Sequence, residues 1–419
     1  MHRLMIAAAL SASLTSFAAA GETGESLAQR LYEGTAPQAR QEFADACGRD
    51  ETDACFGLGL IELIDGVQGL SQALYRHGAS APDVPAAAML LGISADAPDT
   101  MRNPDPEPLT YEGMRTILGD FVIALDKARG HFELAGASGD YVLMIDPLRV
   151  RFDINGDGEV GAGEHLGQVL ADALGPEAFK VKTKPGKPLP DTSIGFDRAD
   201  AIWLAGYTQI TAAPADLLLA HDFSRFFNAI FHRFFPQAGL PMQDYSRGRG
   251  TALLDEESDG FIADFIAAIH TADFPVADSA RLANVRDRLK TITALSRQNW
   301  EAILAETDDN RELVPSPSQT SLLPDQTVTE EVVAAWHATL DTLDLILDGK
   351  LLLPHWRFSQ GFDLKAYFET ATETDLVMLL TGQGALPFLR DGPVADADSF
   401  AAGNRVFGDS WPNFAIWFN

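Results

Sequence analysis

Apolar residues recur at helical spacing along most of the chain. Between residues 111 and 135, six apolar positions three or four residues apart fall on one side of a helix: Met114, Ile117, Leu118, Phe121, Leu125 and Ala128. The same spacing continues through 25–45, 56–75, 196–220, 223–235, 260–271, 279–306 and 329–349. Alternating apolar and polar residues, which would indicate strands, form no stretch of convincing length. The pattern therefore predicts an all-α fold, a compact multi-helix bundle.

Proline and glycine mark where these helices end. Proline-rich stretches at 77–108, 180–190 and 313–326 predict loops, and Asp65-Gly66 predicts a break within 56–75. Residues 361–419 predict short helical pieces with an aromatic ending that docks onto the core. We expect a leader over 1–20, an N-terminal helical region over 21–175 and a C-terminal helical region over 191–419. The two regions are expected to pack as one body, and a division into two domains near 180–190 is the alternative.

One segment admits a membrane interpretation. Seven large apolar residues between 223 and 235 fall on one broad helical face: Phe223, Phe226, Phe227, Ile230, Phe231, Phe234 and Phe235. A helix lying at a membrane surface has such a face, but it also carries lysines on its polar side, and this segment has no lysine. We therefore predict a buried core helix.

The first twenty residues resemble an export signal. Met1-His2-Arg3 precedes an apolar run and the small residues Ala18-Ala19-Ala20, which is the arrangement of a secretory signal peptide cleaved near Ala20. No other stretch approaches about 18 uninterrupted apolar residues, so no transmembrane segment is expected in the mature chain. The predicted location is periplasmic or secreted.

The net charge of the chain excludes some classes of binding partner. Lysine and arginine number 31 against 60 aspartate and glutamate residues, which gives a formal net charge of −29. A chain this acidic is repelled by nucleic acid and by anionic membrane surfaces, and it attracts cations. An acidic surface also keeps an exported protein in solution, and we take this as the main reason for the charge.

Cys47 and Cys55 are the only cysteines, and in an exported chain such a pair predicts one disulfide bond. Cys47 follows one predicted helix and Cys55 begins the next, so the bond would staple an N-terminal helical hairpin. This segment resembles the disulfide-bridged, Sel-like α/α repeats of secreted bacterial proteins, in which a small-Leu-Gly pattern follows the second cysteine. That pattern occurs once here, as Gly57-Leu58-Gly59, so a full repeat array is not expected.

Residues 153–164 combine oxygen-bearing side chains with glycines at a spacing that suits a calcium ion. Gly158, at position six, permits the sharp turn. Gly161, at position nine, has no side-chain oxygen, so a water molecule is expected there. The predicted ligands are the side chains at positions one, three, five and twelve and the backbone carbonyl at position seven: Asp153, Asn155, Asp157, Glu164 and Glu159.

This loop resembles that of the EF-hand family and meets each position of its motif. The resemblance implies that calcium is the cofactor, bound at micromolar to millimolar affinity, between a short helix at 147–152 and a second helix at 164–174. EF-hands usually occur in pairs. A degenerate partner loop at 255–266 is conceivable, although Asp259 acting as the cap of a helix that begins near Gly260 is the simpler interpretation.

No recognised catalytic motif is present in the sequence. An acid–base site would require scattered residues to converge, namely His221, His232, His270 and His355 with Glu306 or Asp308. We therefore expect an exported calcium-binding helical protein, not an enzyme, in which calcium braces or switches a protein-interaction surface. The alternatives are a calcium-stabilised periplasmic enzyme, possibly a hydrolase, and a Sel-like interaction module.

Overall fold

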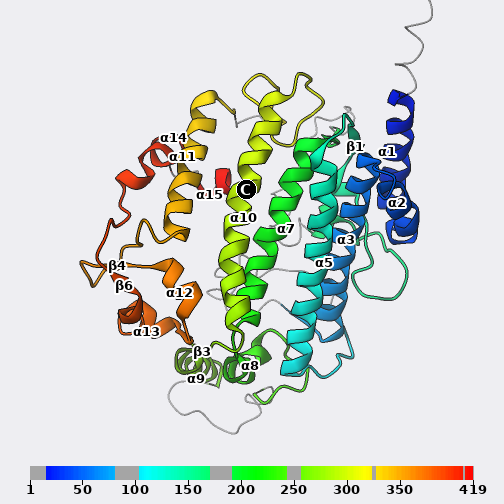
Figure 1. The fold of residues 1–419 in the computed structure, drawn as a ribbon. Coiled ribbons are helices and arrows are strands. Elements are labelled where there is room, and N and C mark those ends of the chain that lie inside the picture. The colour runs from blue at the N-terminus through cyan, green and yellow to red at the C-terminus, as the bar shows by residue number, and fades with distance from the viewer. Residues whose placement is uncertain are drawn as a thin grey trace, which may run out of the picture.

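Five long helices stand side by side in sequence order in the computed structural model (Figure 1). They are α3 (Thr52–Arg76), α5 (Tyr111–Ala137), α7 (Arg198–Leu219), α10 (Ser279–Ala305) and α11 (Glu330–Leu347). The structure describes residues 16–80, 103–169, 191–242, 256–322, 327–408 and 411–418. Most of the described residues are helical, which confirms the all-α class. The long helices observed at 111–137, 198–219, 279–305 and 330–347 match the predicted ones closely.

Glycines bring α3 close to the helices on either side of it. A Cβ atom at Gly59 would lie 2.6 Å from the ring of Phe132 on α5, and one at Gly57 would lie 2.6 Å from the ring of Phe43. No side chain fits at either position without moving an aromatic ring. The predicted break at Asp65-Gly66 is wrong: α3 is continuous, and Gly66 lies within it against Ala124 of α5.

A buried arginine fixes how α5, α7 and α10 align. Arg288 of α10 donates two hydrogen bonds to Asp126 of α5, at 2.6 and 2.7 Å, and one to Asp216 of α7, at 2.5 Å. It also donates to the side-chain oxygen of Gln209. Because unpaired buried charges are costly, a shift of any of these helices along its axis is opposed by the loss of these contacts.

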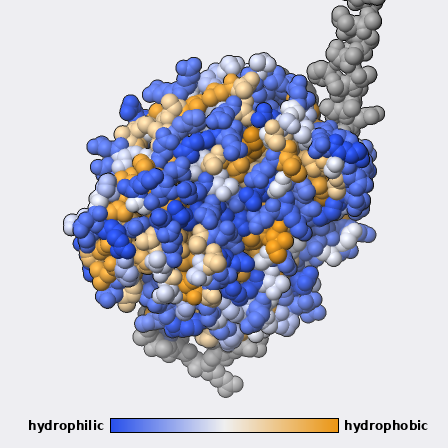
Figure 2. Space-filling view, in the orientation of Figure 1, coloured by the Kyte–Doolittle hydropathy of each residue, from blue (hydrophilic) through white to orange (hydrophobic). Residues whose placement is uncertain are grey.

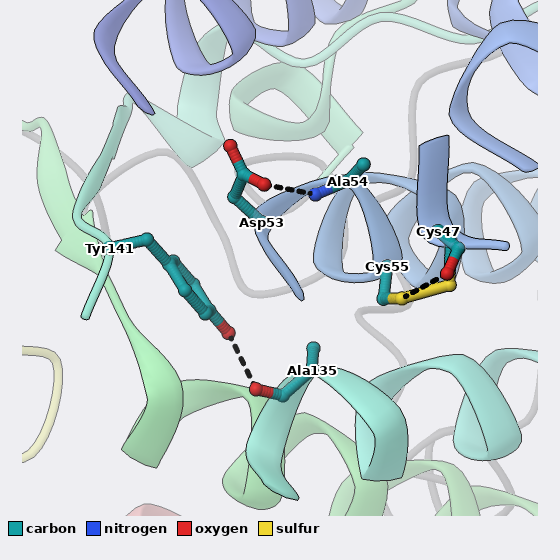
Figure 3. The surroundings of a disulfide bond; sticks show 6 residues. All are labelled: Cys47, Asp53, Ala54, Cys55, Ala135 and Tyr141. Atoms are coloured by element: carbon teal, nitrogen blue, oxygen red, sulfur yellow. Dashed lines mark hydrogen bonds between the residues drawn. A yellow bond between two sulfur atoms is a disulfide. The ribbon is translucent and has the colours of Figure 1, made fainter. Parts of the chain in front are cut away.

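The N-terminal region consists of α1 (Ser16–Glu33), a 3-10 turn η1 (Ala36–Ala39) and α2 (Arg40–Cys47), so the expected stripe at 25–45 is divided between two helices. Cys47 ends α2 and Cys55 lies in the first turn of α3, and the two form a disulfide bond with their Cα atoms 4.6 Å apart (Figure 3). The predicted staple is confirmed. Such bonds persist in oxidising compartments, as expected for an exported chain. Most of the expected leader lies outside the described residues, so the signal peptide stays a prediction.

The phenylalanine-rich segment is core, as predicted, but it is not one helix. It forms α8 (Ser224–Ile230) and a 3-10 turn, η4 (Phe231–Arg233), and Phe223, Phe227 and Phe235 are buried. Next, α9 (Glu256–Thr271) is helical from its first residue, so residues 256–266 cannot form a partner EF-hand loop. Asp259 lies inside this helix and not at its cap, so both sequence interpretations of the segment were wrong.

Short elements follow α11. They are α12 (Leu364–Thr370), α13 (Leu376–Thr381), η6 (Leu386–Phe388), η7 (Asp398–Phe400), α14 (Ala401–Phe407) and α15 (Trp411–Phe418). The aromatic ending docks as predicted. Phe418 is fully buried against Trp300 and Trp336, and Trp203 donates its indole N–H to the carbonyl oxygen of Trp417 at 2.9 Å.

Three two-stranded antiparallel sheets join distant parts of the described chain. The pairs are β1 (Leu143–Ile145) with β2 (Ile194–Phe196), β3 (Asp273–Pro275) with β5 (Glu373–Asp375), and β4 (Gly361–Phe362) with β6 (Leu389–Arg390). The first pair matters most for the site, because β1 leads into the predicted calcium loop. Hydrophobic core residues on α1, α3, α5, α7 and α10 form one cluster, which joins the two halves of the chain.

The surface is largely hydrophilic on the face shown in Figure 2, with small apolar patches. Among the described residues, α3 alone is long and apolar enough to cross a membrane, and half of its most apolar window is buried in the structure. Its Glu62 is buried and accepts a hydrogen bond from Arg40 at 2.7 Å. These contacts are those of a core helix.

Candidate metal site

A short β-type contact joins the two ends of the predicted calcium loop. After β1, the chain forms a three-residue 3-10 turn, η3 (Pro147–Arg149), where a helix over 147–152 was expected. An isolated bridge between Arg151 and His165 then closes the base of the loop. Helical structure resumes at Leu166 and is described as far as residue 169, so the rest of the expected second helix lies outside the described residues.

The first half of the loop folds around its own carboxylates. Asp153 accepts hydrogen bonds from the N–H groups of Gly156, at 2.6 Å, and Gly158, at 3.0 Å. The side chains of Asn155 and Asp157 each accept from the N–H two residues further on, at 2.8 Å. Gly156 and Gly158 have φ of +77° and +84°, a backbone conformation that glycine adopts without strain. The amide of Asn155 also donates to Asp157 at 3.0 Å, so this half of the loop is ordered by its own side chains.

Glu164 closes the loop from its other end. Its side chain is buried and folds back, with Oε1 accepting from the N–H of Ile154 at 2.9 Å and Oε2 from the N–H of Gly161 at 2.6 Å. Oε1 also accepts from the N–H of Asn155, at 3.4 Å. The loop therefore carries oxygen-bearing side chains at positions one, three, five and twelve, while Glu159 at position seven is exposed. The carboxylates of Asp153, Asp157 and Glu164 are not among the described groups whose oxygens all lie within 4.8 Å of one another, so an ion would have to draw them together.

The loop is pinned to α1 and α3. Gln68 accepts a hydrogen bond from the N–H of Asp153 at 3.1 Å, and Gln72 donates to the carbonyl oxygen of Asp153 at 2.9 Å. The N–H of Arg151 donates to the carbonyl oxygen of Leu31 at the end of α1. Val160 lies against Gly34, where a Cβ atom would be 2.7 Å away. An ion in the loop would therefore act on two helices of the N-terminal region.

A second acidic cluster lies outside the loop. Among the described residues, Asp197, Glu306 and Glu312 form the one group of three carboxylates whose oxygens all lie within 4.8 Å of one another. Asp197 caps α7 and forms a capping box with the buried Asp200, while Glu306 follows α10 directly. Carboxylates this close can share protons or hold a divalent cation.

Burial is the largest cause of the raised pKa values in this cluster, and the charge of neighbouring carboxylates is the next. Burial and the charge of Asp197 raise the pKa of Glu306 to about 8. Burial also raises the pKa of Glu312 to about 7, against the opposing hydrogen bond from the N–H of Asn310. For Asp200, burial and the neighbouring Asp197 raise the pKa well above its ordinary value. Part of the cluster therefore holds protons at neutral pH.

The sequence does not predict this cluster. The spacing of Asp197 and Asp200 is readable as a helix cap. Nothing in the sequence, however, indicates that the residue after α10 meets that cap, because the antiparallel packing of α7 and α10 creates the contact. From the sequence, Glu306 and Asp308 are expected only as partners for histidines.

The four histidines have separate surroundings. His221 contacts Thr374 at 2.7 Å, and His232 contacts Asp264 at 3.2 Å. His355 contacts the carbonyl oxygen of Leu379, while His270 lies near the end of α9. None of the described hydrogen bonds or ion pairs links these rings to Glu306 or Asp308. The hypothetical convergent acid–base site is therefore not found among the described residues.

Comparisons with known proteins give no assignment. No protein-family model matches the chain, and no curated protein or solved structure matches it either.

Proposed function

We propose that this is an exported calcium-binding helical protein in which the ion braces a protein-interaction surface. The observation that carries the proposal is the loop at 153–164, where Asp153 and Glu164 approach from opposite ends and accept hydrogen bonds from the loop's own backbone. Both carboxylates belong to one twelve-residue loop, and a hard divalent cation, which prefers oxygen ligands, would draw them together. The net charge of −29 raises the local concentration of cations further.

A brace is favoured over a switch. Calcium sensors respond by changing the angle between two long helices that flank the loop. Here the element that enters the loop is a turn of three residues, too short to act as a lever. The loop instead contacts the sides of α1 and α3 through Leu31, Gln68 and Gln72. Calcium would therefore hold these helices together without reorienting them.

Two other functions have less support. A calcium-stabilised enzyme, possibly a hydrolase, requires a convergent acid–base site, and the dispersed histidines give it no support. A Sel-like interaction module is compatible with the stapled hairpin of α2 and α3. However, the sequence has only two cysteines, so such a stapled hairpin occurs once, and α5, which packs next on α3, is a single helix of 27 residues.

The direct test is calorimetric titration with calcium of the wild-type protein and of an Asp153→Ala, Glu164→Ala double variant. We expect one site in the wild type that the double variant lacks. Calcium at a hundred times its Kd should stabilise the wild type by about 2.7 kcal/mol. For a chain of this length, that corresponds to a rise in Tm of about 3 °C. Equal and negligible uptake by both proteins would contradict the proposal.

The acidic cluster provides the necessary control. A Glu306→Gln, Glu312→Gln double variant removes two of its carboxylates while the loop stays intact. We expect this variant to bind calcium as the wild type does. If this variant loses the site and the loop variant keeps it, then the cation binds at the cluster and the assignment to the loop is wrong.

A further inference from the structure

A cleft of about 600 Å³ lies between α1 and β1, next to the calcium loop. Its apolar surface comes from Ala28 and Tyr32 on α1 and from Val142 and Met144 on the strand side. Val142 and Met144 are two residues apart in extended chain, so both face the cleft. Met144 is 45% exposed, and its flexible thioether side chain can adapt to the shape of a partner.

The rim of the α1–β1 cleft is acidic along α1. Glu25 and Glu33 are exposed and form no ion pair with any described residue, and Gln29 lies between them and donates to Glu33 at 2.8 Å. The one basic residue in the lining, Arg149, has its guanidinium group stacked 4.0 Å from the centre of the Tyr32 ring. The cleft thus combines an apolar floor with carboxylates that lack a cationic partner.

The cleft is built on the same residues that hold the calcium loop. Tyr32 accepts a hydrogen bond at its hydroxyl from the N–H of Asp146 at 2.6 Å, and Arg149 belongs to the turn that enters the loop. Leu31, next to Tyr32, accepts from the N–H of Arg151 at 2.9 Å. An ion that orders the loop therefore fixes the position of α1 relative to β1, which sets the width of the cleft.

We propose that the α1–β1 cleft docks a short peptide segment that carries both basic and apolar side chains, and that calcium in the loop strengthens the docking. Basic side chains would pair with Glu25 and Glu33, and apolar ones would cover Met144 and Tyr32. The proposal rests on the proposed function for its calcium dependence, because the docking surface is held in place by the loop. An uncharged small molecule or a second copy of this acidic chain would leave the two rim carboxylates unpaired.

The test uses a defined probe, the acetylated and amidated hexapeptide Lys-Leu-Lys-Leu-Lys-Leu, titrated calorimetrically into the full chain with calcium present. We expect Glu25→Gln with Glu33→Gln, and separately Met144→Ser, to weaken binding about fivefold or more. The matched controls are Glu330→Gln with Glu331→Gln on α11 and Met378→Ser on α13. Met378 is 44% exposed and Met144 is 45% exposed, so the two methionines differ in their location and not in their exposure. The controls should change the affinity less than twofold.

Each outcome of the peptide titration either supports or contradicts the docking proposal. If the control variants weaken binding as much as the cleft variants do, or if the peptide does not bind, then the cleft is not its site and the proposal is wrong. If the peptide binds in the cleft equally well with calcium and with chelator, the coupling to calcium is wrong. Titration with calcium alone separates these results from a failure of the proposed function, because it measures the loop without the peptide.

Discussion

Gln72 donates its side-chain amide to the carbonyl oxygen of Asp153 over 2.9 Å, and this bond ties the C-terminal part of α3 to the first position of the predicted calcium loop. Gln68, one helical turn earlier, accepts from the N–H of the same residue. The two glutamines hold both backbone groups of Asp153, so the loop's starting point is set by α3 before any ion binds.

Replacement of both glutamines should therefore weaken calcium binding while every ligand is left in place. Each hydrogen bond contributes about 1 kcal/mol, so Gln68→Ala with Gln72→Ala should raise the Kd for calcium by up to about thirtyfold in titration calorimetry. The control is Gln41→Ala, since Gln41 contacts only Asp45 on the surface of α2. An unchanged Kd in the double variant would show that the loop is ordered by the ion alone.

Stability should fall as the pH rises through the range in which the acidic cluster titrates. Burial raises the pKa of Glu306 to about 8 and that of Glu312 to about 7, so the folded state binds more protons than the unfolded state does. The contribution of these two groups to stability is complete below their unfolded pKa of about 4.3 and is lost as the pH passes their folded values. Urea unfolding in chelator should show lower stability at pH 8 than at pH 5.

The Glu306→Gln, Glu312→Gln variant tests this assignment. The amides cannot ionise, so we expect the variant to lose less stability than the wild type between pH 5 and pH 8 and to melt a few degrees higher at pH 8. Glu330→Gln with Glu331→Gln, on the exposed first turn of α11, should retain the wild-type pH dependence. A wild-type slope in the cluster variant would mean that other groups carry the dependence.

Replacement by alanine should change the stability of the protein in opposite directions at two glycines of α3. A Cβ atom at Gly59 would lie 2.6 Å from the ring of Phe132, so Gly59→Ala should cost about 1–3 kcal/mol through overpacking. At Gly69 nothing lies within 4 Å, and Gly69→Ala should stabilise by up to about 1 kcal/mol through helix propensity. Denaturant melts of the two variants measure both effects on one helix. Equal effects would contradict the close approach of α3 and α5.

Loss of Arg288 should destabilise the fold severely. Arg288→Ala leaves Asp126 without its bidentate partner and leaves the buried Asp216 dependent on Arg281, and breaking a buried pair costs up to about 3–5 kcal/mol. By comparison, Arg129→Ala removes a surface pair with Glu133 on α5 and should cost less than about 1 kcal/mol. Urea unfolding gives both values. A loss below 1 kcal/mol at Arg288 would show that the network does not hold the three helices in register.

The sequence predicted the long helices because their apolar spacing is strong and their ends are marked by good caps. Thr110, Asp278 and Thr329 each accept a hydrogen bond from the first turn of α5, α10 and α11. The prediction was wrong at Gly66. Glycine is typical of a helix end, but here it is required by the contact of α3 with Ala124. A local pattern cannot distinguish a glycine that ends a helix from one that admits a neighbour.

The sequence predicts the candidate site only where its residues are contiguous in the chain. The loop at 153–164 is contiguous, so its donors could be read in order. Its contacts with Gln68, Gln72 and Leu31, however, join residues about 80 to 120 positions apart and carry no sequence signal. The same holds for Asp197 and Glu306, which the antiparallel packing of α7 and α10 brings together.

The position of α15 has a consequence for how the protein is made. Phe418 fills the space between Trp300 and Trp336, and the indole N–H of Trp417 reaches the carbonyl oxygen of Leu313. Until α15 has emerged from the ribosome or a translocation channel, both tryptophans lack this cover and are open to water. That half of the molecule can therefore become protease-resistant only after α15 has emerged, whereas the cysteine-linked hairpin can form much earlier.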